Sequence, residues 1–224
     1  MESASEAPKQ NRPIDLSTGV YNNHSAGGCQ TFPGYLLEST MMKNTKRDTI
    51  LETALRLFSQ YGYGNVGIER IISESDVARM TVYKQFGTKD GLIKETLELR
   101  HRNFMEDLLQ YLEPHTRYSD KIRALFEWHQ NWFQSPDFHG CMFIKASEEF
   151  GAVNPQPCAI AQEHKLAILA LLEAILQEPF GAKAHQQAVL VFICLEGLIV
   201  HANMFPGKDL TQDIYQALQP LLAP

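Results

Sequence analysis

The feature that most constrains the fold of this chain is the spacing of its apolar residues. From Thr45 onward they follow the helical period of about 3.6 residues, and Ile50, Ala54, Leu57 and Phe58 share one face of the first such stretch. Short segments containing Gly or Pro separate the helical stretches, and these residues end helices. The sequence shows neither the alternation of half-buried strands nor an internal repeat. It therefore predicts an all-α protein with about nine helices.

Capping and breaking residues place the helix boundaries. Thr45 and Asp48 resemble a capping box, Gly62 ends the helix that follows, and Thr88 can cap a long helix that Pro114 closes. The predicted helices cover about 45–61, 66–74, 78–85, 89–112, 118–134, 139–149, 155–178, 182–204 and 209–221.

Composition limits the classes of function. The 224 residues are 44% hydrophobic and 21% charged, with a net charge of −6, which is ordinary for a soluble globular protein. No apolar run reaches the roughly 20 residues of a membrane span, and the N-terminus lacks the pattern of a secretory signal. Cys29, Cys141, Cys158 and Cys194 form no CxxC pair, which argues against a zinc module or a disulfide framework. We expect a cytoplasmic protein with no metal or other cofactor and no membrane contact.

Residues 1–42 differ from the rest of the chain. They are rich in Ser, Gly, Asn, Pro and Thr and have no helical or strand period, so we predict a disordered N-terminal extension. Met41 and Met42 stand just before the first predicted helix. Translation from one of these two residues is a hypothesis.

Three short predicted helices between residues 43 and 88 match a helix-turn-helix unit, which we take as a DNA-binding domain. Residues 43–100 hold ten basic and eight acidic side chains, whereas residues 101–224 hold eight and fourteen. If the third predicted helix buries Val82 and Phe86, its opposite face exposes side chains that can donate hydrogen bonds to DNA phosphates and a glutamine that can contact a base edge. The candidate DNA-binding residues are Lys46, Arg79, Met80, Thr81, Tyr83, Lys84, Gln85 and Lys89. Judged from periodicity alone, the three helices could equally form a plain structural core with no role in DNA binding.

A set of residues at fixed spacing over about 48 positions carries a family resemblance. These residues are Arg47-Asp48-Thr49-Ile50-Leu51, Ala54, Leu57-Phe58, Gly62-Tyr63, Ile68, Ile71, Val77, Thr81-Val82-Tyr83, Phe86, Lys89-Asp90 and Leu92. In them the chain resembles the TetR family of bacterial transcription regulators. Two departures lie at the turn, where Asp76 replaces the usual Gly and Ala78 replaces the usual Ser or Thr cap. Others, at Met80 and at Lys84-Gln85, fall on the surface that would contact DNA.

The resemblance implies a homodimer that holds two recognition helices about one DNA turn apart over a palindromic operator. It also implies that residues 89–224 dimerise and bind a small-molecule effector, with the fourth helix as the mechanical link. The interface would lie in about 182–221, because the family pairs its last two helices. The first of these is apolar nearly all round, although a buried helix of a monomer would be too.

Aromatic residues of the predicted helical body could line an apolar effector cavity, although each could equally be plain core. The candidates are Phe104, Trp128, Trp132, Phe143, Phe150 and His164. The segment from His139 to Phe150, with Gly-Cys, an apolar run and Glu-Phe, resembles one TetR subgroup. Cys141 and Cys158 could form a redox pair, but buried structural cysteine is the default.

Catalytic motifs are missing from the sequence: it contains no GxSxG, P-loop, GxGxxG or HExxH. Glu148 and Glu149 are adjacent, so on a helix they point about 100° apart and cannot act as a carboxylate dyad. The missing motifs argue against an enzyme, and the family resemblance implies a ligand-responsive DNA-binding repressor. The main alternative is a redox-responsive or ligand-independent DNA-binding regulator, and a more remote one is a helical enzyme. The residues determine neither the chemical identity of the effector nor whether the protein represses or activates transcription.

Overall fold

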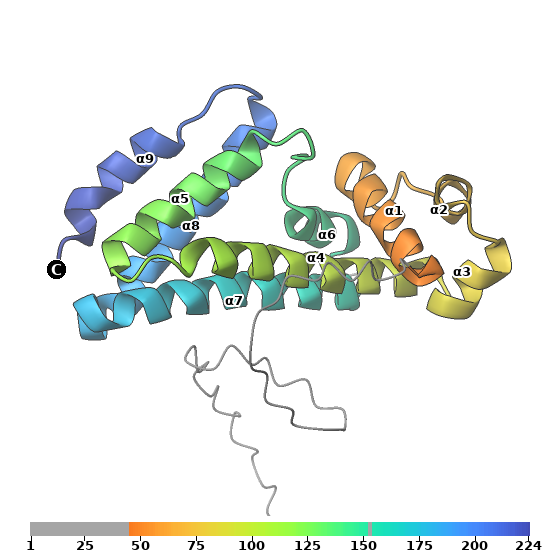
Figure 1. Ribbon diagram of the computed structural model, residues 1–224, viewed down its shortest axis with the longest axis horizontal. Coiled ribbons are helices and arrows are strands. Elements are labelled where there is room, and N and C mark those ends of the chain that lie inside the picture. Colours follow the sequence, from red (N-terminus) through yellow and green to blue (C-terminus); the bar gives the residue numbers. More distant parts are fainter. Residues whose placement is uncertain (1–44, 152–153) are drawn as a thin grey trace, which may run out of the picture. The chain divides into compact units, whose positions relative to one another are not determined.

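The helical pattern of the sequence forms nine α-helices and two short 3-10 helices in the computed structural model, which describes residues 45–151 and 154–224 (Figure 1). The helices are α1 (Lys46–Tyr61), α2 (Ile68–Ser75), α3 (Arg79–Phe86), α4 (Lys89–Leu112), α5 (Tyr118–Phe133), α6 (Met142–Phe150), α7 (Pro155–Phe180), η1 (Gly181–Lys183), α8 (Ala184–Met204), α9 (Thr211–Leu218) and η2 (Gln219–Leu222). The predicted extension 1–42, Cys29 and the hypothetical start at Met41 or Met42 lie outside the described residues.

The predicted caps are present at the helix ends. Thr45 and Asp48 form a capping box, in which the Asp48 N–H donates to Thr45 Oγ1 at 3.2 Å and the Thr45 N–H donates to Asp48 Oδ2 at 3.0 Å. Thr88 Oγ1 accepts the Gly91 N–H at 3.1 Å and begins α4. α6 begins at Met142, not at 139 as predicted, and Gly140 just before it has a φ of +82°, which is incompatible with a helix.

Two hydrophobic cores share α4. Its first half contributes Leu92, Ile93 and Leu97 to a core with α1, α2, α3 and the first turns of α6. Its second half contributes Phe104 and Leu108 to a core with α5, α7, α8 and α9. The predicted domain boundary between residues 88 and 89 lies at the start of this helix and stays a prediction.

The pair formed by α7 and α8 leaves apolar side chains in solvent. After Gly181 the chain turns and α8 runs back along α7 (Figure 1). Leu166 of α7 is 62% exposed, and Ile193 and Met204 of α8 are 60% and 64% exposed. The stretch Pro155–Met204 contains a window with a mean hydropathy of 1.6, apolar enough to cross a membrane by length and composition alone, and 28% of that window is buried. This window differs from the expectation drawn from the sequence, in which no stretch was long and apolar enough for a membrane span.

Candidate DNA-binding surface and ligand cavity

The turn between α2 and α3 has the backbone shape that its sequence predicts. Asp76 adopts a left-handed conformation with φ +51° and ψ +36°, and it is the non-glycine residue with positive φ in the described part of the chain. Asp tolerates this conformation better than most residues. Ala78 stands at the N-cap of α3 and offers no side-chain hydrogen bond, so the predicted loss of a cap is confirmed. Val82 and Phe86 are buried and anchor α3 against the first core.

The opposite face of α3 is open to solvent. Met80 is 76% exposed, Tyr83 is 38% exposed, and Lys84 and Gln85 are exposed as well, whereas Thr81 is partly buried. Figure 1 shows α3 with α1 and α2 around the beginning of α4. Because one face of α3 is buried in the core and the opposite face is exposed, the polar side chains of the exposed face are free to contact a binding partner.

The candidate cations occupy three different settings. Arg79 forms an ion pair with Glu69 of α2, so a phosphate would have to replace that carboxylate. Lys46 is exposed at the first residue of α1. Lys89 is partly exposed at the first residue of α4, where the helix dipole favours an anion.

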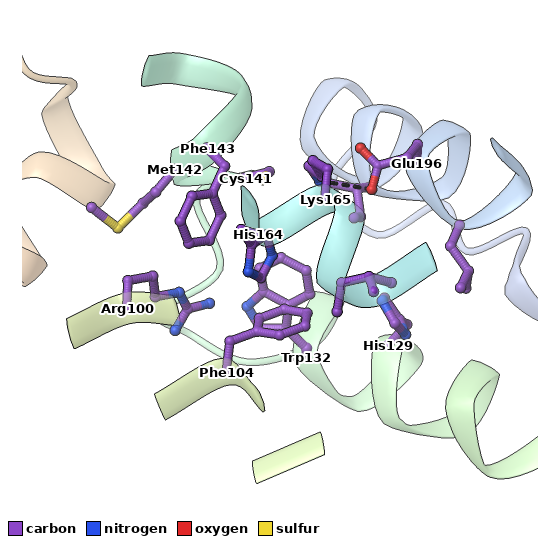
Figure 2. A pocket seen from close by; sticks show the side chains of 13 residues that line it. Arg100, Phe104, His129, Trp132, Cys141, Met142, Phe143, His164, Lys165 and Glu196 are labelled. Atoms are coloured by element: carbon purple, nitrogen blue, oxygen red, sulfur yellow. Dashed lines mark hydrogen bonds and ion pairs between the residues drawn. The ribbon is translucent and has the colours of Figure 1, made fainter. Parts of the chain in front are cut away.

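A cavity lies between five helices of the body (Figure 2). Its lining residues are Arg100 and Phe104 of α4, His129 and Trp132 of α5, Cys141, Met142 and Phe143 at the start of α6, His164, Lys165 and Ile168 of α7, and Leu195, Glu196 and Ile199 of α8. The space measures about 380 Å³ including its open mouth, but almost none of it is wide enough to hold a water molecule. The side chains have thus closed around one another.

Four of the six predicted effector residues line this cavity, namely Phe104, Trp132, Phe143 and His164. Trp128 lies behind the wall, with its ring 4.7 Å from that of Phe104 between centroids. Phe150 lies elsewhere and packs on Tyr63 at 5.3 Å. Both are aromatic residues of a helical interior, but they fill other parts of it.

Two histidines of the cavity are neutral at pH 7. Burial lowers the pKa of His129 to about 4, and its Nδ1 lies 2.8 Å from the Leu125 carbonyl, to which it donates. Burial also lowers the pKa of His164 to about 2. The His164 ring stacks on Phe143 with centroids 3.7 Å apart, and its Nδ1 lies 3.0 Å from Nδ1 of His101. Both histidines therefore have the structural hydrogen bonds expected of buried imidazoles while also facing the cavity.

The charged groups of the lining are unevenly paired. Lys165 Nζ and Glu196 Oε1 are 2.7 Å apart and neutralise each other. The Arg100 guanidinium lies over the rings of Phe104 and Trp132, 5.7 and 5.5 Å from their centroids, and points into the cavity (Figure 2). Burial lowers the pKa of Arg100, and no described carboxylate forms an ion pair with it.

α6 connects the cavity wall to the helix-turn-helix. The α6 residue Glu149 accepts the Tyr63 N–H at 3.1 Å and the Gly64 N–H at 2.6 Å, both in the loop between α1 and α2. Lys145 Nζ donates to the Ser59 carbonyl at 2.6 Å, near the C-terminal end of α1. The buried Tyr63 hydroxyl donates to the Met142 carbonyl at 2.9 Å. We call these four hydrogen bonds the α6 clasp.

Sequence reasoning missed the clasp and the charges of the cavity. The sequence prediction for Glu149 only excludes a carboxylate dyad with Glu148, and no sequence prediction concerns Arg100, Lys165 or Glu196. One sequence signal was available for Arg100, which precedes Phe104 by one helical turn and so shares its face.

Comparison with known sequences finds relatives of the helix-turn-helix segment. Residues 50–96 match the model of the tetR family of bacterial regulatory proteins. The uncharacterized HTH-type transcriptional regulator YezE of Bacillus subtilis (strain 168) is 28% identical over 116 residues, which cover 49% of this chain and 58% of that protein. The HTH-type transcriptional regulator AcrR of Shigella flexneri is 38% identical over 65 residues, covering 29% and 30%. The matches thus span less than two thirds of either relative.

Solved structures share the fold of the whole helical body. The TetR-family transcriptional regulator SCO4454 from Streptomyces coelicolor superposes with a TM-score of 0.73 at 23% identity, covering 79% of this chain and 94% of that one. The reduced form of E. coli NemR gives a TM-score of 0.70 at 19% identity, covering 78% and 95%. The sequence signature and the geometry of α2 and α3 agree that residues 50–96 are similar to the helix-turn-helix segment of the tetR family of bacterial regulatory proteins, and the helical body shares its fold with solved TetR-family regulators.

Proposed function

We propose that the protein is a homodimeric transcription repressor that binds a palindromic operator through α3 and releases it when a small molecule enters the cavity. The observation that carries this proposal is the α6 clasp. One end of α6 forms a wall of the cavity with Met142 and Phe143, and its other end holds the α1–α2 loop through Glu149. A ligand that moves α6 would therefore move the DNA-binding helices.

The closed cavity supplies a reason for movement. Because so little of its space can hold a water molecule, a ligand must part side chains that now touch, and the stacked rings of His164 and Phe143 bridge α7 and α6. Parting them separates α6 from α7. α4, which also contributes to the cavity and to both cores, would follow. The ligand would then favour a dimer whose α3 helices are wrongly spaced for successive major grooves.

The exposed apolar face of α7 and α8 supports the dimer. Ile193 and Val200 of α8 stand two turns apart on one face, and Leu166 of α7 adds to the exposed apolar area. A patch of this kind marks an interaction surface in a protein that stays in solution. Within the predicted range 182–221, α8 is the part that offers this face, because Tyr215 and Leu218 of α9 are buried in the chain's own core.

Selection of bound sequences from random double-stranded DNA tests the proposal. The full-length protein at near-physiological salt should enrich a palindrome whose half-sites lie about one or two helical turns apart. Ile193→Asp should sediment as a monomer and no longer enrich a palindromic sequence. Glu148→Asp, at an exposed position away from this face, should remain a dimer and enrich the same palindrome as the native protein. Absence of sequence-specific binding by the native protein would refute the proposal.

A redox-responsive regulator is the second candidate, because Cys141 lines the cavity and is one of the free cysteines of the described chain. Diamide should then weaken operator binding by the native protein but not by Cys141→Ser. An unchanged operator affinity in diamide would eliminate this candidate.

A further inference from the structure

The cavity carries one unpaired positive charge in an otherwise apolar space. Its two other ionised groups, Lys165 and Glu196, satisfy each other at 2.7 Å, and His129 and His164 are neutral at pH 7. Arg100 alone remains without an opposite charge among the described residues. Asp107, the acidic residue that acts on Arg100 electrostatically, is exposed two turns along α4 and forms no ion pair with it.

An uncompensated cation in such a place destabilises the empty protein. Removing a guanidinium from water costs free energy unless a counter-ion or hydrogen-bond acceptor replaces the water. The rings of Phe104 and Trp132 offset part of that cost through cation–π contact but accept no hydrogen bond from its five N–H groups. A bound anion would offset the rest.

The neighbouring helix end points to the same ligand charge. The lining includes Cys141, Met142 and Phe143, which are the N-cap and first two residues of α6, and no side chain caps this helix. The first N–H groups of a helix lack intrahelical partners and carry the positive end of its dipole. Two independent features, a guanidinium on α4 and an uncapped N-terminus on α6, thus favour negative charge at one side of the cavity.

The remaining walls define the body of the ligand. Phe104, Trp132, Phe143, Ile168, Leu195 and Ile199 are apolar, and they surround the side chains of the two neutral histidines. A single unpaired cation matches one negative charge, so a phosphate dianion would be left partly uncompensated.

We propose that the effector is an amphipathic monocarboxylate, with its carboxylate bound by Arg100 and its aromatic or acyl body held between the apolar walls. This inference rests on the proposed function in taking the cavity as the effector site. Arg100 also lies on α4 close enough to Tyr63 of the clasp for the two to interact electrostatically, so a carboxylate drawn to Arg100 acts where the cavity meets the DNA-binding helices.

Two acid and amide pairs test the charge requirement. The probes are octanoate with octanamide and 4-phenylbutyrate with 4-phenylbutanamide, which differ within each pair in the charge of one end. Binding is followed at pH 7.5 by intrinsic fluorescence, because the chain has two tryptophans, one lining the cavity and the other packed behind it. We expect at least one acid to bind tenfold to a hundredfold more tightly than its amide, as for a charge-assisted hydrogen bond.

Variants assign the preference to one side chain. Arg100→Met should abolish the preference for the acid, and Arg100→Lys, which keeps the charge, should retain part of it. Arg102→Met, which removes an exposed cation two residues along the same helix, should leave it unchanged. Equal affinity for acid and amide, a preference that survives in Arg100→Met, or failure of both acids to bind up to their solubility limits would overturn the inference.

Operator binding separates this inference from the proposed function. If an acid binds in an Arg100-dependent way but does not release DNA, the ligand assignment stands and the release step of the proposed function is wrong. If both acids fail while a neutral compound releases DNA, the ligand assignment is wrong and the proposed function stands.

Discussion

Removal of the Glu149 carboxylate measures the strength of the α6 clasp. Glu149→Ala deletes two charge-assisted hydrogen bonds, at 3.1 Å to the Tyr63 N–H and 2.6 Å to the Gly64 N–H. Such bonds contribute about 1.5–3 kcal/mol each, but the second is exposed and water will replace it. We therefore expect the free energy of unfolding to fall by about 2 kcal/mol, which for a domain of this size lowers Tm by roughly 4–8 °C.

Glu148→Ala is the matched control, because Glu148 is the exposed neighbour on the same helix and makes no hydrogen bond or ion pair with any described residue. It should change Tm by less than about 2 °C, since surface substitutions stay within about 0.5 kcal/mol. Glu149→Gln keeps one acceptor oxygen and should lie between the two. Thermal unfolding followed by circular dichroism at the helix band gives all three values. Equal losses for Glu148→Ala and Glu149→Ala would show that the two hydrogen bonds contribute nothing, and the clasp could not transmit motion.

The remaining predictions concern DNA binding and pH. Lys84→Ala and Lys89→Ala should each weaken binding to all DNA sequences and flatten the dependence of log affinity on log salt by about one unit, measured by fluorescence anisotropy over a salt series; an unchanged slope for both would place α3 away from DNA. Gln85→Ala should relax one operator position by about 1–3 kcal/mol in a repeat of the DNA selection, and an identical preference profile would exclude base contact by this residue. His129, whose pKa falls from 6.5 to about 4 on burial, binds a proton in the unfolded chain more readily than in the folded one. Its contribution to stability is therefore complete above pH 6.5 and is lost as the pH falls toward 4, by about 1.4 kcal/mol at pH 5.5. Urea unfolding at pH 7.5 and 5.5 should show this loss in the native protein and a smaller one in His129→Gln; equal losses would contradict the assignment.

The helices and the exposed face of α3 were predictable because their causes are local. Thr45 and Thr88 cap the helices that follow them through hydrogen bonds spanning three residues. The burial of Val82 and Phe86 sets the rotation of α3 and so decides which side chains remain outside. Asp76 takes the left-handed conformation that its position in the turn requires.

The sequence predicted an apolar cavity lined by aromatic residues, but it could not predict which of those residues line it. An aromatic side chain in an amphipathic helix indicates an interior position, yet Trp132 faces the cavity while Trp128 and Phe150 pack against Phe104 and Tyr63 instead. Which part of the interior an aromatic residue fills depends on the neighbouring helices, and those contacts join residues far apart in the chain.

Sequence periodicity and capping by themselves determined the helices, their order and the polar face of α3, because each depends on residues within one or two turns of the same helix. Only the tertiary structure decided that Arg100 turns inward without a counter-ion, and that Glu149, not Glu148, holds the α1–α2 loop. Both depend on how helices rotate about their axes when they pack. A rotation of about 100° separates one residue from the next on a helix, and the packing that fixes it is shared among elements distant in sequence.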